Sequence, residues 1–312
     1  MSNDFDYITV NKVLIQGGGI ICLQSYENDD MHIMPPAAIK KVTLYSEYSH
    51  KTTLLTTNVT LADITVSSLG TIWAVDMMGH LYSSQSKLSG SDLYEKLETQ
   101  AYALKWSYQR ITEQTPVCII GEDSDLWIAT FEGTLIHYDG RDFTSYTGVK
   151  RPIRFKKVNG DYFLMGYGCQ LMKYENKQWH AMTFDPSIPS DIPINDITYA
   201  NGRLLAVSNL GLILRQQSNN TFAIAMNMPH IPWFGCDTLK DEVYLAGGSK
   251  GAYVLPEPES DDVSKVTLIK QGHFVAVKVL DRKVVFLQAN TASANFVCHL
   301  PSEQREWFLV ST

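Results

Sequence analysis

The sequence predicts an all-β fold built from a repeated hairpin unit. Five segments share one pattern: a polar turn, an apolar or aromatic run, a glycine and then a second apolar run. The closing glycines are separated by 54, 35, 43 and 40 residues. Spacings of this size are typical of proteins made of stacked or radial repeats. The five closing glycines are Gly79, Gly133, Gly168, Gly211 and Gly251.

Each copy has the composition of a β-hairpin. In the two clearest copies, the runs at 72–75 and 126–129 are rich in β-branched and aromatic residues, which favour strands. The glycine after each run suits a turn that needs a positive φ. One more extended run precedes each hairpin, and a further strand at 144–147 follows the second copy, so the unit has four strands. The looser copies span 161–174, 202–214 and 241–255, and the preceding runs are 62–66, 117–120, 153–158 and 194–199.

Four short antiparallel strands at this period form the unit of a β-propeller. Helical repeats would instead place apolar residues three and four positions apart. The end segments 11–23 and 274–287 each predict one more unit. We therefore expect a single propeller domain over residues 1–312, with seven four-stranded blades of about 45 residues each. Six or eight blades are alternatives, and we expect 7–10 or 307–310 to complete a sheet built by the other end of the chain.

The longest spacing between glycines contains a helical pattern. Asp92 can cap a helix with Glu95 three residues later. Four apolar residues then fall on one helical face at spacings of four, four and three. The pattern predicts a short helical insertion near 91–106 that covers the propeller's own edge. The alternative for its latter part is a strand that ends at Tyr108. The four apolar residues are Leu93, Leu97, Ala101 and Leu104.

One copy of the repeat carries a family resemblance. The segment from Asp125 to Gly140 reads DLWIATFEGTLIHYDG. It resembles the short blade motif of regulator-type bacterial propellers, and the copy at 72–82 is similar to it. The resemblance implies a propeller fold and no catalytic residue.

Composition and charge limit the classes of partner. The chain is 45% hydrophobic and 19% charged, with a formal net charge of -7 and only short clusters of Lys and Arg. A nucleic-acid-binding surface is normally basic, so we expect no nucleic-acid partner. The five cysteines include no metal-type C-x-x-C pair, and we expect neither a metal site nor a cofactor. Without a signal peptide or an apolar run of membrane-spanning length, we expect a cytoplasmic monomer that does not bind membranes.

The chain contains none of the local motifs that carry catalysis. A nucleophile elbow, a metalloprotease helix, a P-loop and a dinucleotide fingerprint are all missing from the sequence. We therefore expect a noncatalytic protein. The alternative is a lyase-like or lactonase-like propeller enzyme, whose channel would hold a metal or a His/Glu site that leaves no local spacing to read.

The connections between units are the candidate binding sites. In a propeller, every connection from an outer strand to the next inner strand lies on the same face. The connections at 31–36, 184–193 and 226–234 are rich in apolar, aromatic and proline residues, which suit an ordered protein-binding surface. For Trp233 and Met228 the alternative is packing within the protein. The predicted partner-binding residues are Met34, Asp185, Asp191, Met228, His230 and Trp233.

These observations predict a noncatalytic protein-binding module. A more specific hypothesis is a bacterial immunity protein that neutralises a basic toxin domain, since the chain is acidic and shows neither a targeting signal nor a catalytic motif. A scaffold subunit of a larger assembly is a further alternative.

Overall fold

The computed structural model describes residues 7–16, 19–27, 39–45, 51–57, 59–85, 105–218, 220–280, 283–288, 295–299 and 307–311. The chain divides into two compact units: unit 1 is Met1–Arg151 with Asn290–Ser293, and unit 2 is Pro152–Ala289 with Ala294–Thr312. Apart from the short 3-10 helix η1 (Val263–Lys265), every element in these ranges is a β-strand. Over the same residues, we find no helix with the length and hydropathy of a membrane span.

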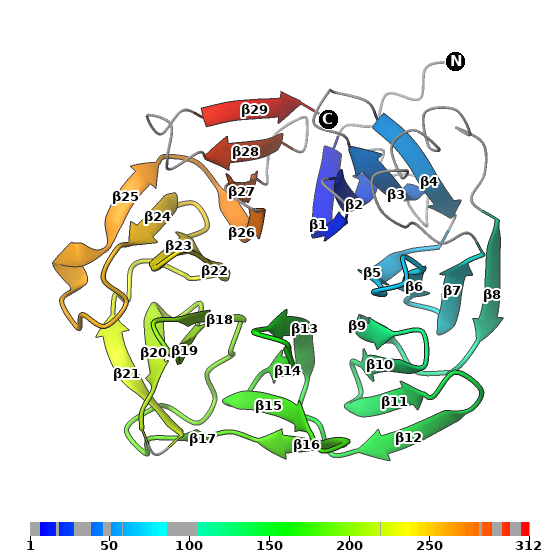
Figure 1. Cartoon of the computed structure of the whole chain (residues 1–312), viewed down its shortest axis with the longest axis horizontal. Helices are drawn as coiled ribbons and strands as arrows, with labels where there is room; N and C mark the ends of the chain where they lie inside the picture. The colour runs from blue at the N-terminus through cyan, green and yellow to red at the C-terminus, as the bar shows by residue number, and fades with distance from the viewer. Residues whose placement is uncertain are drawn as a thin grey trace, which may run out of the picture. The chain divides into compact units, whose positions relative to one another are not determined.

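Unit 1 contains three antiparallel sheets, each made of four strands that follow one another in the sequence (Figure 1). The first consists of β1 (Tyr7–Gln16), β2 (Gly19–Glu27), β3 (Ile39–Tyr45) and β4 (Lys51–Thr57). The second consists of β5 (Leu61–Val66), β6 (Ile72–Asp76), β7 (His80–Ser84) and β8 (Trp106–Arg110). The third consists of β9 (Pro116–Glu122), β10 (Asp125–Thr130), β11 (Thr134–Tyr138) and β12 (Phe143–Thr147).

Unit 2 contains four sheets of the same kind. The first consists of β13 (Pro152–Val158), β14 (Asp161–Gly166), β15 (Gln170–Glu175) and β16 (Gln178–Ala181). The second consists of β18 (Asp196–Ala200), β19 (Arg203–Val207), β20 (Leu212–Gln216) and β21 (Thr221–Asn227), with β17 (Thr183–Phe184) added in parallel to β21. The third consists of β22 (Gly235–Leu239), β23 (Glu242–Ala246), β24 (Ala252–Leu255) and β25 (Thr267–Lys270). The fourth consists of β26 (Phe274–Leu280), β27 (Lys283–Gln288), β28 (Asn295–His299) and β29 (Trp307–Ser311).

The predicted all-β fold of four-stranded antiparallel sheets is confirmed, with two corrections. The terminal strands do not complete each other's sheet, because β1 pairs with β2 and β29 pairs with β28. Each end of the chain supplies four strands of its own, so neither sheet needs a strand from the other end. The predicted helix at 91–106 lies largely outside the described residues. Its last residue, Trp106, begins strand β8, which pairs with β7 at Ser84.

The closing position of the repeat requires glycine, because its φ is positive and the connection that follows the sheet lies against it. Gly211 has a φ of +83° and ends the turn between β19 and β20. Its carbonyl oxygen accepts a hydrogen bond of 2.9 Å from the Met228 amide, so the connection after β21 lies directly against this turn. A Cβ at position 211 would lie 2.2 Å from the Met228 oxygen. Gly79 and Gly133 hold the same position, with Ile111 and Val149 as donors.

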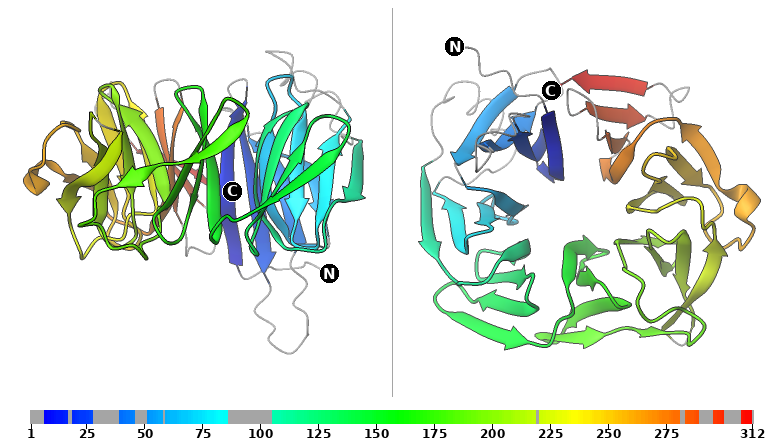
Figure 2. Two further views of the ribbon diagram at one scale, coloured as in Figure 1. Left: turned by 90° about the horizontal axis from the view of Figure 1, so that it is seen from below. Right: turned by 180° about the vertical axis from the view of Figure 1, so that it is seen from behind.

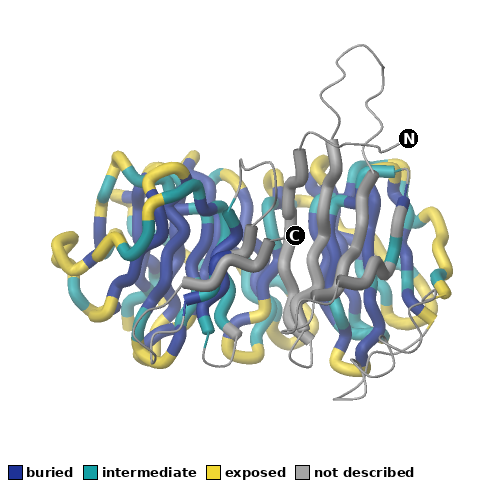
Figure 3. The backbone as a smooth tube through the Cα atoms, turned by 90° about the horizontal axis from the view of Figure 1, so that it is seen from above, coloured by how far each residue is buried: buried dark blue, intermediate teal, exposed yellow. Residues whose placement is uncertain are grey.

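The core lies between neighbouring sheets. On β19, Leu204 and Ala206 belong to the core shared with the sheet of β13–β16, and Leu205 and Val207 belong to the core shared with the sheet of β22–β25. This alternation follows from the two-residue period of a strand. Exposed residues gather at the turns at the two ends of the strands (Figure 3).

Aspartates connect successive sheets within each unit. They lie on the first strand of a sheet, and we call these first strands the inner strands. In unit 2, Asp196 on β18 accepts a hydrogen bond of 3.1 Å from the Cys236 amide on β22. Asp237 on β22 accepts one of 2.9 Å from the Val279 amide on β26. In unit 1, Asp63 on β5 accepts one of 2.9 Å from the Ile119 amide on β9. We call these three residues the inter-sheet aspartates.

Candidate functional site

Two of the predicted connections lie in unit 2, each against the middle hairpin turn of the preceding sheet. The connection 226–234 contacts the turn between β19 and β20, where the Met228 amide donates to Gly211 and the Trp233 amide donates to Ser208 over 3.3 Å. In the connection 184–193, the Ile192 oxygen accepts a hydrogen bond of 2.8 Å from the Cys169 amide, in the turn between β14 and β15. Hairpin turns and connections therefore share one end of the strands in this unit (Figure 2).

The large apolar residues of these connections point inward. Ile188 and Ile192 are buried in the core between the first two sheets of unit 2. Trp233 is fully buried and packs edge-on against Tyr253, with ring centroids 5.3 Å apart. Trp233 thus packs within the protein, which was the alternative to a binding role. In this conformation its ring is not accessible to a partner.

The other predicted binding residues reach the surface to different extents. Asp191 and His230 are exposed, whereas Asp185 and Met228 are half-buried. Hydrogen bonds from the Ser187 hydroxyl and amide lower the pKa of Asp185, which fixes this carboxylate as a turn acceptor. Met34 and the connection 31–36 lie outside the described residues. A partner-binding role for these residues stays a prediction.

Exposed apolar residues occupy the middle hairpin turns, and the sequence reasoning missed them. They are 46–57% exposed and lie one or two positions before a closing glycine. Turn tips are usually built from polar residues and glycine. The turn before the closing glycine therefore carries an unusual surface in four copies. The apolar letters among the two residues before each glycine are the trace of it in the sequence. We call these the tip residues: Met77, Met78 and Phe131 in unit 1, and Tyr167 and Leu210 in unit 2.

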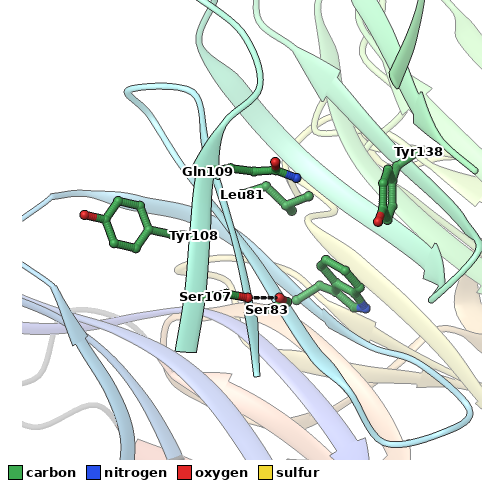
Figure 4. A pocket seen from close by; sticks show the side chains of 7 residues that line it. Leu81, Ser83, Ser107, Tyr108, Gln109 and Tyr138 are labelled. Atoms are coloured by element: carbon green, nitrogen blue, oxygen red, sulfur yellow. Dashed lines mark hydrogen bonds between the residues drawn. The ribbon is translucent and has the colours of Figure 1, made fainter. Parts of the chain in front are cut away.

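A cavity of about 250 Å³ opens at the outer strands of unit 1 (Figure 4). Its walls include the rings of Trp73 and Tyr138, whose centroids are 6.0 Å apart. The hydroxyls of Ser83 and Ser107 face each other at 2.7 Å, while the ring of Tyr108 points away. No carboxylate, imidazole or amine is among its described lining residues. The cavity offers contact surface but no acid–base pair for proton transfer.

Charged side chains gather on the inner strands of unit 2, which lie side by side (Figure 1). Lys156 on β13 is 5% exposed, and its Nζ lies 3.1 Å from the Asp196 carboxylate. The same Nζ donates to the Cys236 carbonyl over 2.6 Å and lies 3.8 Å from Asp237. Arg154 on β13 donates its Nη1 to Asp196 over 3.2 Å. With Lys278 on β26, these five charged residues form what we call the inner-strand cluster.

The cluster shifts the pKa values of its members in opposite directions. Burial acts to lower the pKa of Lys156, but Asp196 and Asp237 outweigh it, so the net shift is upward. Burial acts to raise the pKa of Asp196, but Lys156 and Arg154 outweigh it, so the net shift is downward. For Lys278, burial and the nearby Lys156 lower the pKa to about 8. The pair Lys156 and Asp196 is therefore ionised, while the pKa of Lys278 is about 8.

The sequence contained a signal for this cluster that was not used. Arg154 and Lys156 lie within the predicted strand 153–158, and Asp196 lies within the predicted strand 194–199. Across the described part of the chain, we find no group of three or more His, Cys, Asp or Glu residues arranged to hold a metal ion. Cys118 and Cys236 are buried free thiols, and Cys169 and Cys298 are half-buried ones.

Comparison with known proteins identifies the fold and no family. No family model matches the sequence, and no curated protein matches it. The WD40 β-propeller domain of Doa1 is similar, with a TM-score of 0.62 and 10% identity over 93% of this chain and 95% of that one. YCF48 bound to D1 peptide has a TM-score of 0.57 and 10% identity over 81% of each chain.

A designed protein gives the same result. The computationally designed Ika8 protein has a TM-score of 0.59 and 7% identity over 92% of this chain and 95% of its own. At such low identities the likeness concerns the fold alone. The sheets of this protein thus have the fold of a β-propeller.

Proposed function

We propose that this protein is a noncatalytic protein-binding β-propeller, and that it binds its partner through the tip residues and the connections beside them. The observation that carries the proposal is the recurrence of exposed apolar side chains in the turn that ends at the closing glycine. Exposed apolar residues that recur on one face favour a protein interface. In unit 2 this surface consists of Tyr167 and Leu210, with Asp191, Met228 and His230 on the adjacent connections.

Charge suggests the kind of partner. The net charge is -7, and the carboxylates of Glu132 and Asp191 lie beside tip residues at the surface. A net negative charge favours a partner with a net positive charge. YCF48, one of the similar propellers, is bound to a peptide. A basic toxin domain neutralised by this chain as a bacterial immunity protein is the specific form of the proposal, and a scaffold role in a larger assembly is its alternative.

Substitution of tip residues tests this proposal. We expect the double variant Tyr167→Ser and Leu210→Ser to lower partner affinity at least about tenfold, because apolar anchors supply most of an interface's binding energy. The measurement is affinity capture from the producing cells, followed by titration of the captured partner. For the toxin hypothesis, co-expression with that partner should restore growth with the original chain and fail with the double variant.

The matched control removes exposed apolar residues elsewhere in unit 2. Ile224 on β21 and Leu268 on β25 are 38% and 39% exposed, and neither lies at a tip. The double variant Ile224→Ser and Leu268→Ser should bind as the original chain does. Equal affinity of the tip variant and the control would contradict the proposal.

We further propose that the seven described sheets are the blades of one closed propeller in the cytoplasm. The similar propellers each align over most of this chain, which supports the proposal. A compact globule of this length has a radius of gyration of about 20 Å. Small-angle scattering of the intact chain should give that value, whereas two units joined without closure would give a clearly larger one.

A further inference from the structure

We propose that the cavity between the second and third sheets of unit 1 binds one pyranose ring of an uncharged sugar. Its described lining residues include no tip residue and no part of the connections beside the tips. The proposal therefore goes beyond the proposed protein-binding function and does not rest on it.

The register of the second sheet places polar and apolar side chains together on one wall of the cavity. Trp73 on β6 pairs with Ser83 on β7, which in turn pairs with Ser107 on β8. Two positions away, Leu81 on β7 pairs with Gln109 on β8. Because side chains alternate between the two faces of a strand, these side chains all lie on the same face of the sheet.

The opposite wall is an aromatic ring from the third sheet. Tyr138 on β11 faces Trp73, with ring centroids 6.0 Å apart and ring planes at 59°. The Trp73 Nε1 donates to Asp123 over 2.9 Å, and the Tyr138 hydroxyl donates to the Gly140 carbonyl over 2.9 Å. Phe143 stacks on Tyr138 with centroids 4.7 Å apart. The polar atoms of both cavity rings are thus already bonded, and the rings offer apolar faces at a fixed angle.

Other polar atoms of the cavity are available to a ligand. The hydroxyls of Ser83 and Ser107 lie 2.7 Å apart and share one hydrogen bond, which leaves one hydroxyl hydrogen and further lone pairs. The side-chain amide of Gln109 points across the cavity toward Tyr138 (Figure 4), and it forms no hydrogen bond to another residue that the structure describes. Hydroxyls and amides both donate and accept, so they suit a ligand whose groups do the same.

The size of the cavity limits the ligand to one ring. The volume is about 250 Å³. Pockets for drug-sized ligands measure about 300–1,000 Å³, so this cavity is smaller than those. A single six-membered ring with its substituents is the size of ligand that it holds.

A pyranose matches both kinds of surface in the cavity. One face of its ring carries C–H groups that pack on aromatic rings, and its edge carries hydroxyls that donate and accept hydrogen bonds. A quaternary ammonium ion or a proline ring would use the aromatic faces but would leave the serine hydroxyls and the amide without partners, which costs affinity. The described lining residues carry no charge, so the sugar is an uncharged one. It is either a free monosaccharide or the terminal residue of a glycan.

The test uses the full chain with the methyl glycosides of glucose, galactose, mannose and N-acetylglucosamine. Saturation-transfer NMR identifies the sugar protons that touch the protein, and titration gives the Kd. We expect saturable binding of at least one glycoside with a Kd of about 1 mM, in keeping with its size. Saturation should be strongest at the C–H protons of one ring face. If an oligosaccharide ending in the same sugar also binds, the source is a glycan, and binding of the glycoside alone indicates a free sugar.

Two variants test the two kinds of surface. Tyr138→Ala removes an aromatic face and should weaken binding at least about fivefold. Gln109→Leu removes the amide from an exposed position at similar side-chain size and should weaken binding about fivefold. Tyr138→Phe keeps the ring and should bind as the original chain does. Tyr108→Ala is the matched control, because its ring is 69% exposed on the same strand as Gln109 and points away from the cavity.

Three results would overturn the proposal. The first is that none of the four glycosides binds. The second is that Tyr138→Ala or Gln109→Leu binds as tightly as the original chain, or that Tyr108→Ala loses as much affinity as they do. The third is that tetramethylammonium or hexaproline binds in place of the glycosides, which would assign the cavity to a cation or to a proline-rich segment.

Discussion

Asp196→Ala is expected to destabilise unit 2 by about 3–5 kcal/mol, the usual cost of leaving one partner of a buried ion pair behind. The Asp196 carboxylate compensates the buried ammonium of Lys156 at 3.1 Å and connects β18 to β22 through the Cys236 amide. Without it, Lys156 would keep a buried charge with Asp237 as its nearest carboxylate, at 3.8 Å. Urea unfolding at pH 7, followed by circular dichroism, measures the difference.

A second ion pair of unit 2 provides the matched control. Lys173 and Asp161 lie 3.0 Å apart, but Asp161 is 46% exposed. Exposed pairs contribute little, so Asp161→Ala should cost less than about 1 kcal/mol. If Asp196→Ala lowers the free energy of unfolding no more than Asp161→Ala does, burial of the ion pair does not affect its contribution to stability.

The buried pair of Lys156 and Asp196 makes the stability of the fold depend on pH. Because the pKa of Asp196 is lower in the folded protein than in the unfolded chain, the unfolded chain binds more protons as the pH falls. The stability that Asp196 contributes is therefore fully present above pH about 4 and is lost below it, as the pH passes through the folded pKa. The difference between the original chain and Asp196→Ala should shrink in that acidic range.

Gly211→Ala is expected to cost about 3 kcal/mol or more. The residue would be held at a positive φ, which alone costs a non-glycine residue about 1–3 kcal/mol. Its Cβ would also lie 2.2 Å from the Met228 oxygen, so the connection 226–234 would have to move and strain its hydrogen bond to the turn. Thermal unfolding of the variant measures the loss.

Gly202 separates the two contributions. It has a φ of +81°, but an added Cβ would meet nothing within 4 Å. Gly202→Ala should therefore cost only the conformational penalty, about 1–2 kcal/mol. If both variants lose the same stability, the close approach of the connection to Gly211 does not matter.

The sequence was sufficient for the hairpins because their signals are local. The strands predicted at 72–75, 126–129 and 153–158 lie within β6, β10 and β13, and the aromatic residues Trp127, Phe163 and Tyr244 of the repeated hairpins are buried. Trp73 is the exception: it is half-buried and lines the cavity of unit 1. Its side chain meets the neighbouring sheet near Tyr138, a contact that periodicity along one strand does not reveal.

The candidate sites were harder to predict, since they depend on contacts between distant segments. Composition marked the connection 226–234 as a surface but did not show that Trp233 turns inward onto Tyr253. The inner-strand cluster joins residues on β13, β18, β22 and β26, and only their placement in space shows that the charges meet. The tip residues needed knowledge of exposure, because an apolar residue before a glycine reads equally well as core.

The consecutive order of strands in each sheet has a consequence for the folding kinetics. Every antiparallel pair joins neighbouring strands in the sequence, so each sheet can form as its residues leave the ribosome. The inter-sheet aspartates act over separations of 40, 42 and 56 residues and can engage only after two sheets exist. Loss of Asp196 should thus increase the unfolding rate far more than it decreases the folding rate. The lifetime of the native state then depends on the hydrogen bonds of the inter-sheet aspartates, which form only after the sheets have folded.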